Sequence, residues 1–287
     1  MTKLTAIILA AGKGTRMESS LPKVLHKVCG CSMLEHVLNA AEAAGCRDNV
    51  VVLGHGAELV REIIEDSARI VLQKKQLGTG HAALQAADIL NTFTGTVMIL
   101  CGDTPLLEAA ELRKFYEEHI QSGATATIMT AMMDEPFGYG RILRDENGNV
   151  TGIVEDKDAT NEQKQIKEIN AGIYCVEAPL LFEVLQSLTN KNRQGEYYLT
   201  DIVATLCAMG KKVGGVVTAD AEMIMGVNTR QQLAEAEKIM QRRIQEKAVA
   251  SEMIRETAIE KLVAIGAIAT ETAREIKAES GGKKNSL

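Results

Sequence analysis

The sequence has no tryptophan, few other aromatic residues and no long apolar run. Aromatic side chains make up 3% of the 287 residues and hydrophobic residues 46%, so a core must be built mostly from aliphatic side chains and methionine. A membrane-spanning helix needs about 20 apolar residues, and the short apolar run near the N-terminus is followed at once by glycines and charges. We therefore expect that run to be a buried strand, and we expect a cytoplasmic protein without a membrane partner.

The sequence also lacks an excess of basic residues and any cysteine or histidine motif typical of a metal site. Lysine and arginine number 32 against 38 acidic residues, which gives a net charge of −6 and argues against broad nucleic-acid binding. The six cysteines are dispersed without a CxxC pair, as expected for reduced thiols. The five histidines show no metal-ligand spacing, and no Ser/His/Asp order indicates a nucleophilic triad.

Short apolar runs alternate with amphipathic segments through the first 135 residues. This alternation predicts an α/β fold of Rossmann-like type, with a mixed, mainly parallel sheet and helices on both faces. Ser32 and Glu35 form a predicted capping box at the start of a helix that ends at Gly45. The expected strands are 5–9, 49–53, 70–72, 96–100 and 126–130, and the other expected helices are 57–64, 79–90 and 109–121.

After residue 135 the pattern changes to one of hairpins and isolated strands. A turn at Asn147-Gly148 predicts a hairpin that ends in a strand at 150–154. Further strands are expected at 169–176 and 213–218, and a long charged helix at 229–253.

The segment Leu9–Met17, LAAGKGTRM, follows the first predicted strand and has the composition of a phosphate-binding loop. Gly12 and Gly14 free the backbone for close approach to a polyphosphate, and successive amides can bind an anion. Arg16 and, further on, Lys23 supply positive charge for phosphate oxygens. A dinucleotide-binding GxGxxG loop is excluded because Met17 stands at its third glycine position, and the GK[ST] of a Walker A loop is absent.

Polar residues follow other predicted strands, where parallel α/β sheets bind their ligands. Asp103 follows the strand 96–100, and its carboxylate, with the amide oxygen of Asn228, suits Mg²⁺. A turn or helix-start role is the alternative for both residues. Gln73 follows another strand and offers a donor and an acceptor. Glu155 and Asn170 lie at the edges of apolar strands, facing either a ligand or solvent.

In order and spacing, these segments resemble the sugar-nucleotide pyrophosphorylase family. Within that family, they are most similar to the uridylyltransferase domain of bifunctional bacterial enzymes that make UDP-N-acetylglucosamine. The resemblance covers roughly residues 4–245. Its motifs are GKGTRM with LPK at 12–23, QKKQLGTGH at 73–81, CGDTPL at 101–106, GYGR at 138–141, GIVE at 152–155, EINAG at 168–172, GEYYLTD at 195–201 and GVN at 226–228.

The resemblance implies an enzyme of cell-wall (peptidoglycan) precursor synthesis that uses UTP and N-acetylglucosamine 1-phosphate and releases pyrophosphate. It implies Mg²⁺ as cofactor, held by Asp103 and Asn228, with Arg16 and Lys23 as catalytic residues. It assigns substrate binding to Leu9, Ala10, Ala11, Gly12, Gln73, Gly78, Thr79, Cys101, Gly140, Glu155, Asn170 and Asn228.

The resemblance also divides the chain into segments. Residues 1–228 are the expected nucleotidyltransferase domain, with a nucleotide-binding half at 1–135 and a sugar-binding half at 136–228. Residues 229–253 are the long helix, and 254–287 an expected helical extension with a disordered tail. No hexapeptide repeats follow residue 245. We therefore expect no acetyltransferase activity and, although a homo-oligomer is possible, no β-helix trimer.

Three readings of the function remain open. Cys101 stands where an aromatic residue is common in the family, which changes the expected contacts to the sugar. A related pyrophosphorylase that uses another sugar 1-phosphate or TTP is therefore one alternative. A catalytically silent regulatory domain of the same fold is another, disfavoured by the presence of Arg16, Lys23, Asp103 and Asn228 together.

Overall fold

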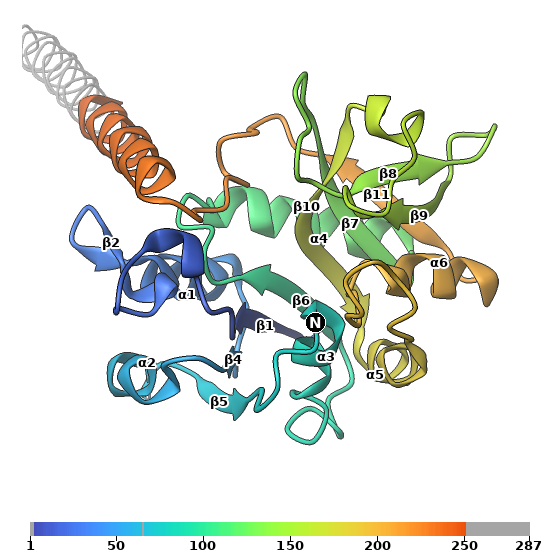
Figure 1. Ribbon diagram of the computed structural model, residues 1–287, viewed down its shortest axis with the longest axis horizontal. Helices are drawn as coiled ribbons and strands as arrows, with labels where there is room; N and C mark the ends of the chain where they lie inside the picture. Colours follow the sequence, from blue (N-terminus) through green and yellow to red (C-terminus); the bar gives the residue numbers. More distant parts are fainter. Residues whose placement is uncertain (1–2, 65, 251–287) are drawn as a thin grey trace, which may run out of the picture. The chain divides into compact units, whose positions relative to one another are not determined.

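The computed structural model describes residues 3–64 and 66–250. The chain divides into two compact units, residues 1–237 and 238–287. In the described part, nine strands form one sheet whose main path runs β11-β7-β10-β6-β1-β4-β5 (Figure 1). Residues 230–250 are helical. The last residues of the expected long helix and the expected extension at 254–287 lie outside the described residues.

The first half of the sheet is parallel, as the alternating pattern predicts. Strand β1 (Leu4–Ala10) pairs with β4 (Val50–Leu53) on one side and with β6 (Thr96–Cys101) on the other, and β5 (Arg69–Leu72) extends the edge beyond β4. Because these strands run the same way, the residues that follow them meet at one edge of the sheet.

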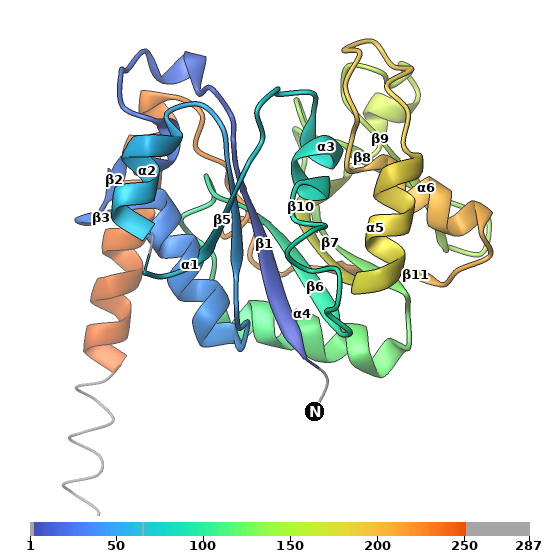
Figure 2. The same cartoon turned by 90° about the horizontal axis from the view of Figure 1, so that it is seen from below.

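Helices cover both faces of this sheet (Figure 2). In β1, Ala6 and Ile8 belong to one buried cluster and Ile7 to another, as the alternation of side chains along a strand requires. The first cluster includes residues of α1 (Met33–Ala44), α2 (Ala57–Ile64) and α4 (Ala109–Ser122). The second includes residues of α3 (Thr79–Leu84), α5 (Ala178–Ser187) and α6 (Asp201–Ala208).

The second half joins the same sheet through an antiparallel strand. Strand β10 (Glu168–Glu177) lies between β6 and β7 (Ala126–Met132) and runs antiparallel to both. Strand β11 (Val213–Val217) is parallel to β7. The expected hairpin is formed by β8 (Arg141–Arg144) and β9 (Val150–Val154), and β8 pairs with β10. The expected mixed, mainly parallel fold is therefore confirmed.

Local structure departs from the sequence pattern in two places. The helix expected at 79–90 ends at Leu84, because residues 85–87 donate to carbonyls three positions back rather than four. Ala86 and Leu90 stay buried, so the apolar spacing persists without a regular helix. Helix α5 was not expected, although Pro179 in its first turn is a helix-start signal. The capping box of Ser32 and Glu35 is confirmed.

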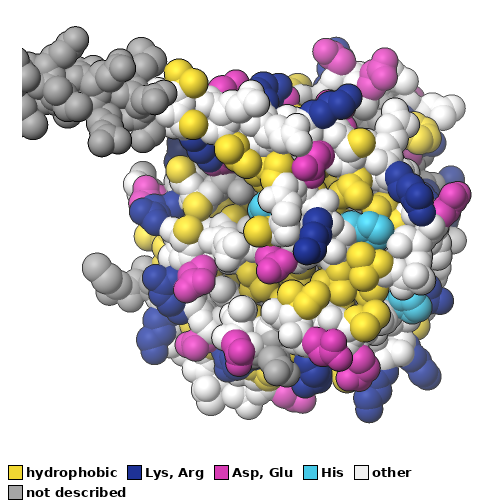
Figure 3. All heavy atoms as spheres, turned by 90° about the vertical axis from the view of Figure 1, so that its left-hand side faces the viewer, with side chains coloured by type: hydrophobic (Ala, Val, Ile, Leu, Met, Phe, Trp, Pro, Cys, Tyr) yellow, Lys and Arg dark blue, Asp and Glu magenta, His cyan; other side chains and the backbone are white. Residues whose placement is uncertain are grey.

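The surface carries charges of both signs. On the face shown in Figure 3, acidic and basic side chains alternate around the rim, and hydrophobic side chains gather nearer the centre. Within the described residues, no helix is long and apolar enough to cross a membrane.

Candidate functional site

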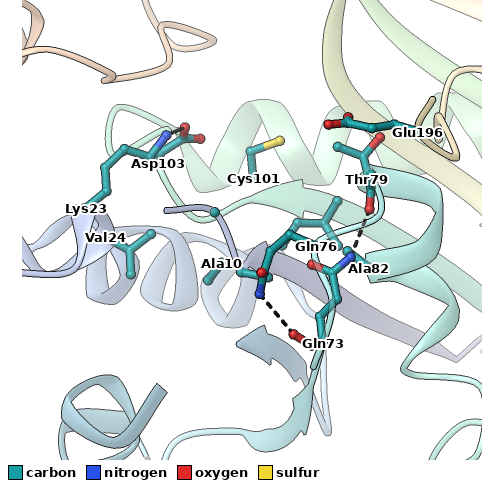
Figure 4. A pocket seen from close by; sticks show the side chains of 14 residues that line it. Ala10, Lys23, Val24, Gln73, Gln76, Thr79, Ala82, Cys101, Asp103 and Glu196 are labelled. Carbon is teal, nitrogen blue, oxygen red and sulfur yellow. Dashed lines mark hydrogen bonds and ion pairs between the residues drawn. The ribbon is translucent and has the colours of Figure 1, made fainter. Parts of the chain in front are cut away.

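A cavity of about 270 Å³ lies where β1, β5 and β6 end (Figure 4). Most of the predicted substrate and metal residues of the first half line it. These are Leu9, Ala10, Ala11, Gly12, Lys23, Gln73, Gly78, Thr79, Cys101 and Asp103. The lining also includes four residues that the sequence did not single out, namely Val24, Gln76, Ala82 and Glu196.

One end of the cavity holds a lysine between two oxygen ligands. The Lys23 ammonium forms an ion pair with the Asp103 carboxylate and donates to Asn228 Oδ1 over 3.0 Å. The backbone N–H of Val227 donates to the Asp103 carbonyl over 2.9 Å, which fixes the two segments side by side. Residues 205 positions apart in the sequence are thus brought together, as the motif order implies.

Arg16 lies outside this group. It belongs to a 3₁₀ turn at Thr15–Met17, its side chain is exposed, and within the described residues it makes no hydrogen bond or ion pair. Gly14, with φ of +62°, starts the turn, and a Cβ there would lie 2.5 Å from the Cβ of Lys23. Arg230 donates to the carbonyl of Met17 over 3.2 Å. The sequence analysis did not identify this anchoring role of Arg230.

At another corner of the cavity, the amide of Gln73 is held in one orientation. Its Nε2 donates to the carbonyl of Gly78 over 3.0 Å and lies 2.9 Å from Nδ1 of His81. Burial lowers the pKa of His81, which favours the neutral ring, and in the tautomer protonated at Nε2 the Nδ1 atom accepts from this amide. Both amide hydrogens are therefore used. The Gln73 residue is 3% exposed, and its Oε1 remains as an acceptor.

The segment around Gly78 is clamped by the loop that precedes α6. The N–H of Tyr197 donates to Leu77, and the N–H of Gly80 donates to Tyr197, both over 2.8 Å. The N–H of Leu199 donates to Thr79 Oγ1 over 2.9 Å. A Cβ at Gly78, whose φ is +113°, would lie 2.5 Å from the carbonyl oxygen of Tyr197, so only glycine fits.

Two predicted residues of the second half, Gly140 and Asn170, contact each other and do not line this cavity. The N–H of Asn170 donates to the carbonyl of Gly140 over 2.9 Å, and its side chain donates to the Tyr174 hydroxyl over 2.7 Å. Its Oδ1 accepts from the N–H of Gly172 over 3.0 Å. The thiol of Cys101, at the cavity wall, lies 3.9 Å from the carbonyl of Gly172. Cys101 therefore lies between the cavity and this group.

Glu155 is partly buried, and the pKa of its carboxyl group is raised. Burial raises its pKa, and the carboxylates of Asp201, Asp158 and Asp156 raise it further. The hydroxyl of Thr200 opposes this by donating to Glu155 Oε1 over 2.9 Å. Thr200 belongs to the GEYYLTD motif, so this motif and the GIVE motif are joined by a hydrogen bond.

Comparison with known proteins decides the family. The nucleotidyl transferase family model matches residues 5–222. The chain belongs to the nucleotidyl transferase family. It is 53% identical over 235 residues to the Bifunctional protein GlmU of Pelotomaculum thermopropionicum, which covers 82% of this chain and 51% of that protein. The GlmU of Clostridioides difficile is 48% identical over 233 residues, which covers 81% of this chain and 50% of that protein.

The matches cover most of this chain but only part of each curated relative. The chain spans about half the length of the curated relatives it matches. A solved structure of UDP-glucose pyrophosphorylase complexed with UDP-glucose has the same fold, with a TM-score of 0.66 and 17% identity. It matches over 85% of this chain and 100% of that one. The resemblance expected from the motifs is confirmed.

Proposed function

We propose that this nucleotidyl transferase forms UDP-N-acetylglucosamine and pyrophosphate from UTP and N-acetylglucosamine 1-phosphate. The observation that carries the proposal is a single cavity with a fixed acceptor amide, Gln73, at one corner and the Lys23–Asp103–Asn228 group near another. The high identity to GlmU proteins supports the same assignment. Because UTP is an intracellular metabolite, the activity requires a cytoplasmic location.

The orientation of Gln73 supports a uracil-type base. Uracil has a ring N3–H donor between two carbonyl oxygens, whereas the corresponding nitrogen of cytosine is an acceptor. Since Nε2 of Gln73 is used by Gly78 and His81, its Oε1 is free to accept from N3–H. A buried acceptor that is placed to meet a ring N–H disfavours a base without this N–H, because the acceptor would then have no hydrogen bond. The proposal therefore includes selection of UTP over CTP, but not over TTP.

The oxygens of Asp103 and Asn228 fit a magnesium site. Both lie against the Lys23 ammonium, so a carboxylate and an amide oxygen already converge on one positive charge. Mg²⁺ accepts such oxygen ligands, and it usually keeps water and substrate phosphates in its other positions. We assign Asp103 and Asn228 to hold it. When bound, Mg²⁺ would supply neutralisation of the phosphate charges.

The remaining catalytic contribution is assigned to cationic side chains. A sugar phosphate is already an anionic nucleophile, so the reaction needs no general base. The obstacle is the repulsion between two anions, and catalysis then depends on positioning and charge neutralisation. Arg16 and Lys23 are the proposed groups. Gly12 and Gly14 would place backbone amides near the triphosphate.

The sugar is assigned to the second group of residues. Glu155 and Asn170 are proposed to bind sugar hydroxyls and the backbone of Gly140 to meet the N-acetyl part. The contact of Cys101 with Gly172 joins this group to the cavity wall, which supports a continuous path from nucleotide to sugar. The small thiol leaves more space beside the sugar than an aromatic side chain would.

The test is a pyrophosphate-release assay with Mg²⁺. UTP, TTP and CTP are each combined with N-acetylglucosamine, glucosamine and glucose 1-phosphates, with Asp103→Asn as the control variant. We expect the highest kcat/KM for UTP with N-acetylglucosamine 1-phosphate and a large loss in the control. A preference for another pair would replace the substrate assignment. Absence of release with every pair would indicate a silent domain.

A further inference from the structure

Glu196 presents a free carboxylate to the cavity. It is a lining residue (Figure 4), its side chain is half-buried, and within the described residues the carboxylate accepts no hydrogen bond and forms no ion pair. A negative charge beside a site for a triphosphate is unfavourable unless a ligand donor or cation faces it. A ligand donor that enters the cavity can therefore pair with this carboxylate.

The backbone holds Glu196 firmly in this place. Its N–H donates to Asn192 Oδ1 over 3.2 Å, and its carbonyl accepts from Asn192 Nδ2 over 2.6 Å. The adjacent N–H of Tyr197 donates to Leu77 over 2.8 Å. An added Cβ at Gly78 would lie 3.0 Å from the Glu196 Cβ, so the two segments are in direct contact. Glu196 is thus tied to the same segment that orients Gln73.

The position of Glu196 identifies the part of the nucleotide that it faces. Figure 4 shows it beside Thr79, with Cys101 between it and the Lys23–Asp103 pair, so it lies away from the proposed phosphate end. The donors of uridine are the base N3–H and the ribose hydroxyls. Because Oε1 of Gln73 is available for N3–H, the ribose hydroxyls are the donors left for a carboxylate.

We propose that Glu196 accepts hydrogen bonds from the ribose hydroxyls and selects ribonucleotides over 2′-deoxyribonucleotides. This inference rests on the proposed function and adds the sugar of the nucleotide to its specificity. A carboxylate accepts two hydrogen bonds from neighbouring hydroxyls, and such charge-assisted bonds are stronger than neutral ones. Removal of the 2′-hydroxyl leaves one of them unmade, which makes dTTP and dUTP poor substrates.

The experiment compares UTP with dUTP, which differ only at the 2′ position. The kcat/KM for each nucleotide is measured in wild type, Glu196→Gln, Glu196→Ala and Glu162→Gln. The last is a control at an exposed carboxylate. We expect wild type and control to prefer UTP at least about tenfold, Glu196→Gln to keep part of the preference through its remaining oxygen, and Glu196→Ala to lose most of it. Calorimetric binding of UTP and dUTP without sugar phosphate should show the same order.

Three results would overturn the inference. One is an unchanged UTP preference in a folded Glu196→Ala protein. Another is no preference in wild type. The third is a rise in KM for the sugar 1-phosphate alone, which would place the carboxylate against the sugar substrate. If wild type released no pyrophosphate from either nucleotide, the proposed function itself would fail, and the binding comparison would still test Glu196.

Discussion

The two ends of the cavity differ in how far the protein fixes its side chains before a ligand arrives. Around Gln73, both hydrogens of the amide have partners, and the segment 77–80 is clamped by two backbone–backbone hydrogen bonds and one from the Leu199 N–H to the Thr79 hydroxyl. At the proposed phosphate end, Arg16 is exposed and has no partner in the part of the chain that the structure describes, and the Lys23 ammonium is bound to Asp103 and Asn228.

This difference follows from the chemistry that each end must perform. Recognition of a base depends on the direction of one donor and one acceptor, so it requires a rigid amide. Neutralisation of phosphate depends on charge, which acts over longer distances and in any orientation. We therefore expect substitutions at the base end to affect binding and folding together, and substitutions at the phosphate end to affect turnover with little effect on folding.

The largest expected effect is that of Arg16→Ala. Loss of one transition-state contact typically costs about 10²–10³-fold in kcat, whereas the exposed Arg16 side chain contributes little to stability. Steady-state kinetics and thermal unfolding measure the two properties. Lys13→Ala, an exposed lysine in the same loop, is the matched control. Near-normal turnover in a folded Arg16→Ala protein would remove Arg16 from the proposed mechanism.

Gln73→Ala should affect substrate binding and stability more than kcat. The KM for UTP is expected to rise about tenfold, because the proposed N3–H acceptor is lost. Stability should also fall, by about 1 kcal/mol, since the Gly78 carbonyl loses its side-chain donor and keeps only the N–H of Ala82. The measurements are kinetics and denaturant unfolding. Gln121→Ala, at an exposed glutamine near the end of α4 and outside the cavity lining, is the control. A stable variant with unchanged KM would show that Gln73 is not the fixed contact.

The sequence predicted the elements near the site better than it predicted which distant residues contact one another in the fold. Periodicity and the strand-end rule located Gln73 and Asp103 because these depend on local order along parallel strands. Glu196 and the clamp on Thr79 depend on a contact between residues 120 positions apart, for which periodicity gives no signal. The shortened α3 shows the same limit. Its apolar spacing continues to Leu90, and only packing against α5 and its neighbours decides where the helix ends.

A smaller effect is expected for metal binding in Lys23→Met. The Lys23 ammonium forms an ion pair with the Asp103 carboxylate and donates a hydrogen bond to the amide oxygen of Asn228. Its removal should tighten Mn²⁺ binding to the substrate-free protein by about fivefold or more, since two unit charges 4 Å apart repel by about 1 kcal/mol even in bulk water. Electron paramagnetic resonance of free Mn²⁺ measures this without catalysis. An affinity equal to that of Lys13→Met would show that Lys23 does not compete with the metal.

The smallest expected effect concerns Glu155, at the sugar end. Its pKa is raised by burial and by Asp201, Asp158 and Asp156, so the folded protein retains a proton over a pH range in which the unfolded chain has lost it. Stability from this group therefore falls as the pH rises through that range. Glu155→Gln removes the free-energy cost of ionising this carboxyl group in the folded protein, and it keeps an oxygen that accepts a hydrogen bond from Thr200.

We expect Glu155→Gln to raise Tm by about 1–3 °C at pH 7, and the gain should shrink at pH values where Glu155 is protonated in both states. Thermal unfolding from pH 4 to 8 measures this, with the exposed Glu162→Gln as the control. The KM for sugar 1-phosphate should rise in the same variant. A pH-independent Tm difference would mean that packing, rather than the charge of Glu155, sets the stability there. A gain in stability coupled to a loss in sugar binding would show that the sugar end, unlike the base end, retains a side chain that weakens the fold.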